Sequence, residues 1–327
     1  MKFLKNKTIM ITGGTGSFGQ VCTKYLLKQD IKKLIIFSRD ELKQFEMSNK
    51  FNSSKIRFFV GDVRDRHRLE LATRKVDIII HAAALKQVLA AEYNPMETIK
   101  TNIYGAENVI SASLENNVEK VIALSTDKAA NPANLYGATK LCADKLFVNA
   151  NYLSGDRDTK FAVVRYGNVA GSRGSVLPYF KSLLQQNAKS LPVTDERMTR
   201  FWITLDQGVK FVLSSIDMMK GGELFVPKSP SIKIVDLVKA LDKNIKYHII
   251  GIRPGEKLHE ILCPEDSVRD TIEFKNYYLI RPPADFAKSN YTVNKNNEKG
   301  KFVKDNFVYS SNTNPDFLAT KDLKKFI

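Results

Sequence analysis

Cysteine, histidine and long apolar runs are scarce in this chain of 327 residues. The three cysteines, Cys22, Cys142 and Cys263, lie far apart without CxxC spacing, which is typical of reduced thiols. The four histidines are scattered, so no motif indicates a metal site. The start, MKFLKNKTIMITGG, has an apolar run too short for a signal peptide, and no later run approaches transmembrane length. We therefore expect a cytoplasmic protein without membrane insertion.

A basic tract is also missing, although the formal net charge is +16. Lysines and arginines are spread singly among acidic residues, and no aromatic RNA-binding signature accompanies them. This pattern argues against a nucleic-acid partner. A small phosphate-bearing ligand, an anionic membrane surface or a genome's preference for lysine explains the charge more simply. A hydrophobic content of 43% and a charged content of 26% are ordinary for a globular enzyme.

Short apolar runs alternate with helical patterns through the first half, which predicts an α/β fold with a doubly wound parallel sheet. The candidate strands span residues 8–12, 33–38, 56–62, 76–83, 120–126 and 160–167. We predict an NADP-binding Rossmann domain over residues 1–170. A smaller, mainly substrate-binding lobe follows over residues 171–287, with some segments returning to the sheet. Residues 288–327 are polar and rich in Asn and Lys, so we expect a loosely packed tail with at most one terminal helix.

A glycine-rich stretch, ITGGTGSFG, directly follows the first predicted strand. Gly13 would permit a tight turn, Gly16 would let the backbone approach a pyrophosphate, and Gly19 would let the next helix pack closely on the strand. The amino terminus of that helix would then face the phosphates. A merely flexible turn is the alternative, but the position between strand and helix favours a dinucleotide site.

The second predicted strand ends in FSRDELK, where the adenosine ribose of a dinucleotide would lie. Arg39 and Lys43 could pair with a 2'-phosphate, which favours NADP over NAD. Asp40 keeps NAD open, because a shift of one residue would bring a carboxylate to a ribose hydroxyl. Asp62 ends the third strand and could accept a hydrogen bond from the adenine amine, or could equally cap a helix.

Tyr136 and Lys140 form a YxxxK pair in the stretch STDKAANPANLYGATK. A tyrosine removes a hydroxyl proton only as phenolate, and an unperturbed tyrosine at pH 7 is short of this by about 4 kcal/mol. Lys140, one helical turn away, and a positive nicotinamide ring would favour the anion. Thr126 could donate to the same substrate oxygen. An exposed helical pair is the alternative, which the preceding glycine motif makes less favourable.

Asp127 and Lys128 end the fifth predicted strand, just before this pair. Once the C4 hydroxyl of a sugar is oxidised, the C5 proton becomes acidic, and loss of the C6 hydroxyl needs a base and an acid. Lys128 would be the base only with a pKa lowered by about three units, through burial or nearby positive charge. A turn carrying a surface ion pair is the alternative interpretation.

These motifs resemble the extended short-chain dehydrogenases/reductases, and more narrowly the inverting UDP-N-acetylglucosamine 4,6-dehydratases that open pseudaminic acid biosynthesis. The stretches that carry the resemblance run from about residue 8 to residue 262 and include TGGTGSFG, SRDELKQ, GDVRD, HAAALK, ALSTDKAANPANLYGATK, VVRYGNVAGSRGSV, TDERMTRFWIT and GIRPGEKLHE. One departure from the family stands out: the chain reads KQVL after HAAAL where the family usually has KHVP. Related retaining dehydratases carry Met where this chain has Tyr136, which favours the inverting enzyme.

The resemblance implies an enzyme in which Tyr136 and Lys140 oxidise C4, Asp127 is the acid toward the C6 hydroxyl, and Lys128 is the base at C5. Hydride would then return to C6, and C5 would be protonated from the opposite face. A retaining dehydratase and a bifunctional dehydratase/5-epimerase stay open, as does a non-catalytic dinucleotide-binding module. The implied substrate is UDP-N-acetylglucosamine, and family members assemble as homo-oligomers from dimers to hexamers.

The motifs and the resemblance together define the expected binding residues. For the cofactor these are Gly13, Thr15, Gly16, Ser17, Phe18, Gly19, Ser38, Arg39, Asp40, Glu41, Leu42, Lys43, Asp62, Val63, Ala82, Lys86, Thr101, Tyr136 and Lys140. For the sugar nucleotide they are Lys86, Thr126, Asn168, Val169, Arg173, Gly174, Ser175, Val176, Thr194, Arg253 and Glu256. Arg197 and Arg200 are weaker candidates. Arginines suit a diphosphate, because their planar fork binds two oxygens at once.

Overall fold

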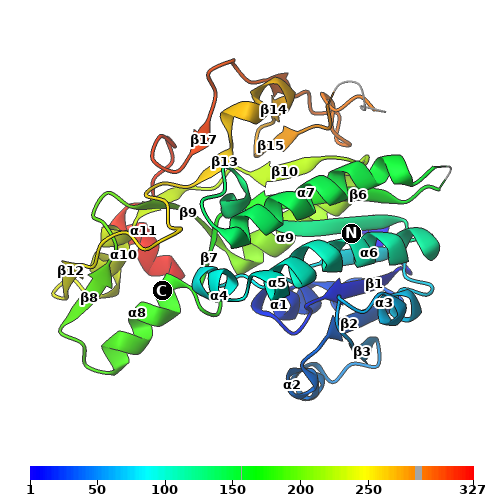
Figure 1. Ribbon diagram of the computed structural model, residues 1–327, viewed down its shortest axis with the longest axis horizontal. Helices are drawn as coiled ribbons and strands as arrows, with labels where there is room; N and C mark the ends of the chain where they lie inside the picture. Colours follow the sequence, from blue (N-terminus) through cyan, green and yellow to red (C-terminus); the bar gives the residue numbers. More distant parts are fainter. Residues whose placement is uncertain (156, 284–288) are drawn as a thin grey trace.

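A ten-stranded sheet forms the centre of the computed structural model, which describes residues 1–155, 157–283 and 289–327 (Figure 1). Its parallel part has the order β3-β2-β1-β4-β5-β6, the doubly wound arrangement. These strands are β1 (Thr8–Thr12), β2 (Lys33–Ser38), β3 (Ile56–Val60), β4 (Ile78–His81), β5 (Lys120–Thr126) and β6 (Lys160–Tyr166). The predicted fold class is therefore confirmed, and each strand end lies within two residues of its prediction.

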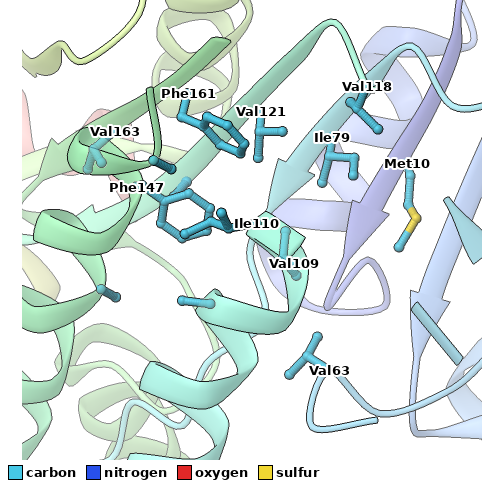
Figure 2. Packing of buried hydrophobic residues seen from close by; sticks show 14 of the residues in the cluster. Met10, Val63, Ile79, Val109, Ile110, Val118, Val121, Phe147, Phe161 and Val163 are labelled. Carbon is cyan, nitrogen blue, oxygen red and sulfur yellow. The ribbon is translucent and has the colours of Figure 1, made fainter. Parts of the chain in front are cut away.

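Helices cover both faces of this sheet (Figure 1). One face is covered by α3 (Arg66–Ala72), α6 (Gly105–Glu115) and α7 (Leu135–Leu153), and the other by α1 (Ser17–Leu26), α2 (Glu41–Phe51) and α9 (Leu205–Met218). Successive side chains of a strand point to opposite faces. Met10 therefore joins the cluster that contains Phe147 of α7 (Figure 2), whereas Ile9 and Ile11 join the cluster under α1 and α9. Burial on both faces explains the continuous apolar runs of the sequence.

Segments of the second half of the chain return to the sheet beyond β6. Strand β10 (Leu224–Pro227) pairs parallel with β6 and antiparallel with β15 (Tyr277–Ile280). β15 pairs with β14 (Thr271–Glu273), which pairs in turn with β16 (Lys301–Phe302). The long α9 provides the crossover into β10, and its amino terminus carries a capping box between Thr204 and Gln207.

A smaller lobe lies beyond the carboxyl ends of the parallel strands (Figure 1). It contains a three-stranded sheet of β7 (Asn168–Ala170), β9 (Thr199–Thr204) and β11 (Ser231–Lys233), together with α8 (Val176–Gln185), β8 (Ser190–Val193), α10 (Ile234–Leu241) and β12 (Lys246–Ile249). Trp202, Phe180 and Leu237 are buried in its own hydrophobic cluster. The lobe thus begins with β7, slightly before the boundary that we predicted after residue 170.

The C-terminal segment is fastened to both parts, so the prediction of a loosely packed tail is wrong for the described residues. Strand β17 (Tyr309–Ser310) pairs with β13 (Ile261–Cys263), and α11 (Thr320–Leu323) packs on α10. Tyr291, Tyr309 and Leu323 are buried although the surrounding sequence is polar. A few aromatic anchors suffice to hold such a segment. The predicted boundary between residues 287 and 288 lies outside the described residues.

The described residues also contain several short elements. They are η1 (Lys2–Leu4), α4 (Val88–Tyr93), α5 (Pro95–Ile99), the π-helical turn η2 (Lys100–Tyr104), η3 (Asp127–Ala129), η4 (Glu265–Asp270) and η6 (Lys324–Phe326). None of the helices in the described ranges has the length and apolar character needed to cross a bilayer. The turn η3 joins the end of β5 to the stretch that leads into α7, and so connects the segment that carries Lys128 to the helix that carries Tyr136.

Candidate active site

A cavity of about 1300 Å³ lies between the carboxyl ends of the parallel strands and the smaller lobe. Ligands of open α/β sheets bind at this edge. All five predicted catalytic residues line the cavity, and so do the predicted substrate-binding residues. Among the predicted cofactor residues, Glu41 and Leu42 do not line it, since they lie in the first turn of α2 with Leu42 largely exposed.

The glycine loop after β1 is built so that side chains cannot fit. Gly13 has a φ of +65°, and a Cβ added to it would lie 2.8 Å from the Ala83 Cα. A Cβ on Gly19 would lie 2.1 Å from the Gly14 oxygen, within the close contact between α1 and the loop. Gly16 precedes the first residue of α1. Thr15, Ser17 and Phe18 line the cavity beside them. This cradle, which opens onto a helix amino terminus, fits a dinucleotide pyrophosphate.

The end of β2 brings Ser38, Arg39, Asp40 and Lys43 to the cavity wall. Asp40 caps α2 by accepting from the backbone N–H of Lys43 at 2.9 Å, and its other oxygen pairs with the Lys43 ammonium. These hydrogen bonds lower the pKa of Asp40. Arg39 is half exposed and its guanidinium lies 3.4 Å from Asp62. The carboxylate of Asp40 is thus already engaged, while Arg39 stays accessible from the cavity.

The opposite wall of the cofactor end joins the smaller lobe to the glycine loop. Arg173 donates to the Thr15 carbonyl at 2.9 Å, and Lys86 donates to the Arg173 carbonyl at 2.9 Å. Burial, and then the charge of Arg173, lower the pKa of Lys86. Arg173 was predicted for the substrate alone, but it lies directly against the predicted pyrophosphate cradle. Val63, Ala82 and Thr101 line the same end of the cavity.

The KQVL departure has a local explanation in this wall. A Cβ added to Gly174, which has a φ of +74°, would lie 2.5 Å from the amide nitrogen of Gln87. Gln87 therefore packs against the loop that carries Arg173, in the position where the family usually has a histidine. Lys86 keeps its place in the cavity lining, so the departure changes the wall and leaves the lysine.

Helix α7 places Tyr136 and Lys140 on its first turns, both buried. Its N-cap, Asn134, accepts from the Gly137 N–H at 2.8 Å. A Cβ added to Gly137 would lie 2.2 Å from the Lys128 carbonyl oxygen. The helix can therefore approach the η3 turn only because residue 137 is glycine. This contact brings Tyr136 beside Asp127 and Lys128.

Tyr136 is a phenol in this environment. Burial raises its pKa to about 12, with the positive charge of Lys128 and a hydrogen bond with Thr126 acting in the other direction. The pKa of Lys140 is lowered by burial, and the nearby Asp144 opposes that shift. The positive charge of Lys128 thus favours the phenolate, a role that we predicted for Lys140 and the nicotinamide ring.

Asp127 and Lys128 form an ion pair on the turn after β5. The Lys128 ammonium lies 3.0 Å from Asp127 Oδ1, which also accepts from the Thr126 hydroxyl at 2.9 Å. Burial lowers the pKa of Lys128, but Asp127 and Glu260 together raise it above its ordinary value. The lowered pKa that a base at C5 would need is therefore not found in the protein alone, because the two carboxylates outweigh burial and the positive charge of Arg200.

Glu260 is a residue of this site that the sequence reasoning missed. It lies just before β13, is 2% exposed, and its Oε1 is 3.2 Å from the Lys128 ammonium. The motif GIRPGEKLHE ends on this glutamate, but the motif alone does not say which of its two acids reaches the lysine. Only the fold brings residues 128 and 260 together.

The sugar end of the cavity is formed by the lobe. Asn168, Val169, Gly174, Ser175, Val176, Thr194, Arg253 and Glu256 line it. Arg253 forms an ion pair with Glu256, and this pair offsets the effect of burial, so that the pKa of Glu256 is lowered. Arg200 also lines the cavity, but its guanidinium donates to the Lys257 and Leu258 carbonyls at 3.0 and 3.1 Å. Arg197 pairs with Asp195 at the surface and does not line the cavity.

Comparisons with known proteins show the family of this chain. The profile of the family described as "Polysaccharide biosynthesis protein" matches residues 9–282. A Campylobacter jejuni protein named UDP-N-acetylglucosamine 4,6-dehydratase (inverting) is 59% identical over 324 residues, which cover 98% of this chain and 97% of that protein. A Rickettsia bellii protein named UDP-glucose 4-epimerase is 45% identical, with 88% of this chain and 85% of that protein covered.

Solved structures give the same picture. The X-ray structure of Pen from Bacillus thuringiensis matches with a TM-score of 0.91 at 36% identity, covering 99% of this chain and 98% of that one. DesIV, a dTDP-glucose 4,6-dehydratase from Streptomyces venezuelae, matches with a TM-score of 0.68 at 20% identity over 77% of this chain and 86% of its own, which shows the fold alone. The resemblance drawn from the motifs is confirmed. The chain therefore belongs to the polysaccharide biosynthesis protein family of extended short-chain dehydrogenases/reductases.

Proposed function

We propose that this protein is an NADP-dependent UDP-N-acetylglucosamine 4,6-dehydratase that inverts C5. One observation carries the proposal: Asp127, Lys128 and Tyr136 meet in a single cavity that continues without a break to the glycine loop. A dehydrogenase needs the tyrosine and the cofactor cradle, whereas an elimination needs an additional acid and base. The relative that is 59% identical carries this activity in its name, which supports the same assignment.

Tyr136 takes the proton of the C4 hydroxyl in the redox half of the reaction. Bound NADP would accept the C4 hydride and later return it to C6. Since burial raises the pKa of Tyr136, its phenolate needs the positive charge of Lys128 and that of an oxidised nicotinamide nearby. The Thr126 hydroxyl, which donates to Asp127 Oδ1 in the protein alone, would favour the anion by turning its proton toward Tyr136. Lys140, buried one turn further along α7, supports the same tyrosine.

Asp127 and Lys128 perform the elimination half. Moving one proton across the 3.0 Å between them converts the ion pair into a neutral amine and a carboxylic acid. The amine then takes the C5 proton, and the acid protonates the departing C6 hydroxyl, so that water leaves. The Oδ2 atom of Asp127 is buried and has no hydrogen-bond partner among the described residues, so this carboxyl keeps an unused hydrogen-bonding position.

Arg39 is the residue on which we base the preference for NADP over NAD. A 2'-phosphate at the end of β2 would meet the guanidinium of Arg39 and the ammonium of Lys43. Asp40, the alternative ligand for a ribose hydroxyl, is already engaged in capping α2 and pairing with Lys43. Arg173, bound to the Thr15 carbonyl, adds positive charge beside the pyrophosphate cradle.

The proposal also covers the reaction product, the cellular compartment and the oligomeric state. Protonation of C5 from the opposite face gives UDP-2-acetamido-2,6-dideoxy-β-L-arabino-hex-4-ulose, a precursor for pseudaminic acid or a related surface-glycan sugar, made in the cytoplasm. The protein would assemble as a homo-oligomer, from dimer to hexamer. The exposed apolar side chains of Tyr93, Met96 and Tyr104, of which Tyr93 is 85% exposed, support this part of the proposal.

Incubation with UDP-N-acetylglucosamine and NADP, followed by mass spectrometry and NMR, tests the proposal. We expect a product lighter than the substrate by one water, with a C4 ketone and a C6 methyl group. A retaining dehydratase would give a product with the D configuration at C5 from the start. A bifunctional dehydratase/5-epimerase would give a product with the D configuration in a later phase, and a time course separates the two. A product of unchanged mass with an inverted C4 would instead make the protein an epimerase and contradict the proposal.

A further inference from the structure

Glu260 occupies a position that the proposed chemistry does not yet use. It is 2% exposed, and its Oε1 lies 3.2 Å from the Lys128 ammonium. Asp127 Oδ1 contacts the same ammonium at 3.0 Å. The ammonium therefore lies between two buried carboxylates that come from distant parts of the chain. A lysine side chain has many rotamers, so two contacts restrict its position far more than one.

The backbone of Glu260 is itself held rigidly. Its N–H donates to the Ser311 hydroxyl at 2.9 Å, and the Ser311 N–H donates to its carbonyl at 2.8 Å. The Ser311 hydroxyl also contacts the Thr199 hydroxyl at 2.7 Å. Three segments, from β9, from the approach to β13 and from the C-terminal region, are joined at this point. A glutamate whose side chain was only solvated would not need a backbone held by these hydrogen bonds.

The charges around the lysine and the glutamate nearly balance. Facing Lys128 are Asp127 of its own turn, Glu260 beside β13, Arg200 of β9 and the phenol of Tyr136 on α7. Facing Glu260 there are also Lys257, at 3.6 Å from Oε2, and Arg200, whose Nε lies 3.9 Å from Oε1. Buried charges of this kind persist only when they are paired. Loss of the single negative charge of Glu260 would leave three cations facing Asp127 alone.

We propose, building on the proposed dehydratase function, that Glu260 is a positioning residue: it holds the Lys128 ammonium beside Asp127 and is its second counter-ion between turnovers. The lysine then always starts a turnover from the same place, with its proton aimed at the carboxylate that must receive it. Glu260 has no need to touch the sugar nucleotide, because it acts through Lys128. The Arg200 guanidinium, anchored on the Lys257 and Leu258 carbonyls, keeps the glutamate in place from the lobe side.

The test compares three variants of the full-length protein. Glu260→Gln keeps the shape and removes the charge. Glu260→Asp keeps the charge but withdraws it by one methylene. Glu223→Gln is the matched control, because Glu223 is equally buried but accepts from the Lys220 and Gly221 backbone amides, far from the cavity lining. Each protein is labelled with ¹³C at lysine Cε and titrated by NMR, with Lys128→Arg used to assign the resonance.

We expect Lys128 to titrate about one to three pH units lower in Glu260→Gln than in the parent. In Glu260→Asp the pH at which Lys128 titrates should lie between those of the parent and Glu260→Gln. In Glu223→Gln, Lys128 should titrate as in the parent. The acid limb of the kcat profile should move to lower pH in the same order, while KM for the substrate changes less than kcat. An unchanged Lys128 titration in Glu260→Gln, with only a lower Tm as in Glu223→Gln, would overturn the proposal.

Two features keep this test decisive. If Glu260→Gln fails to fold, the test uses Glu260→Asp alone. A Lys128 titration in Glu260→Asp that is identical to that of the parent would then overturn the proposal. The titration also needs no turnover. A parent protein without dehydratase activity would refute the proposed function, while the position of the Lys128 titration would still decide the role of Glu260.

Discussion

The two ends of the cavity are built by different means. At the cofactor end, one continuous stretch after β1 forms the cradle, and backbone geometry shapes it: Gly13 and Gly19 leave no space for a Cβ. At the elimination end, Lys128, Arg200, Glu260 and Ser311 meet through side chains from segments up to 183 residues apart, counted from residue 128 to residue 311. The first end depends on steric fit, and the second depends on charge balance.

This difference determines how each end responds to change. A single methyl group added to a glycine of the cradle would force the backbone apart. Such a change should weaken cofactor binding and lower the stability of the fold together. A charge network fails when one partner is removed, because the remaining buried charges are left unpaired. Substitutions can therefore separate the two ends by which property they damage.

The largest effect is expected where the two ends meet. Tyr136→Phe and Lys128→Met should each lower kcat by about 10²- to 10⁴-fold, since each removes a proton-transfer group. Tyr136→Phe should leave the Tm near that of the parent. Lys128→Met should also lower the Tm, because Asp127 and Glu260 lose their shared cation. Steady-state assays and thermal denaturation measure both quantities.

Lys145→Met is the matched control for that pair, because Lys145 is an exposed lysine on the same helix as Tyr136. It should behave like the parent in both assays. A Lys128→Met protein with a normal Tm would show that the buried carboxylates do not depend on the lysine.

Gly19→Ala tests the steric end. The added Cβ would lie 2.1 Å from the Gly14 oxygen, so α1 must move away from the loop. We expect a loss of about 1–3 kcal/mol in the free energy of unfolding, together with weaker NADP binding. Urea denaturation and fluorescence titration of the cofactor measure these. Gly208→Ala is the control, since that helical glycine has no atom within 4 Å of the added carbon, and it should stabilise by about 0.5–1 kcal/mol.

His81, the buried last residue of β4, makes the stability of the protein depend on pH. Burial, and then Lys140, lower its pKa to about 3. The unfolded chain therefore binds this proton below about pH 6.5, while the folded protein stays neutral, so stability is lost as the pH falls between these values. The contribution approaches about 1.4 kcal/mol per pH unit. His81→Gln should flatten the dependence between pH 7 and pH 5 in urea denaturation; an equal slope in both proteins would contradict the assignment.

The smallest expected effect concerns the choice of cofactor. Arg39→Ala should weaken NADP binding about tenfold while leaving NAD binding nearly unchanged, because one charge-assisted contact is lost. Calorimetric titration of each protein with NADP and with NAD measures the two dissociation constants and so their ratio. Arg66→Ala, which removes an exposed arginine paired with Glu70, is the control. An equal loss for both cofactors would mean that Arg39 binds a part that NADP and NAD share.

The glycine loop of the cofactor end could be predicted from the sequence, whereas the contacts of the elimination end could not, for the same physical reason. Gly13, Gly16 and Gly19 are close in sequence and have a local function, so their spacing is informative. The pKa of Lys128 depends on Glu260, which lies more than a hundred residues away, and only the tertiary fold shows that contact. Likewise Tyr291 and Tyr309 gave no pattern in a polar stretch, and their burial made the prediction of a loose tail wrong.

The central claim is that a redox pair and an elimination pair act on one sugar in one cavity. The most direct measurement is NMR of the first product formed from UDP-N-acetylglucosamine in deuterated water. The account predicts a C6 methyl group, the L-arabino configuration at C5 and one solvent deuterium at C5. A first product with the D configuration at C5, or with no deuterium there, would contradict it.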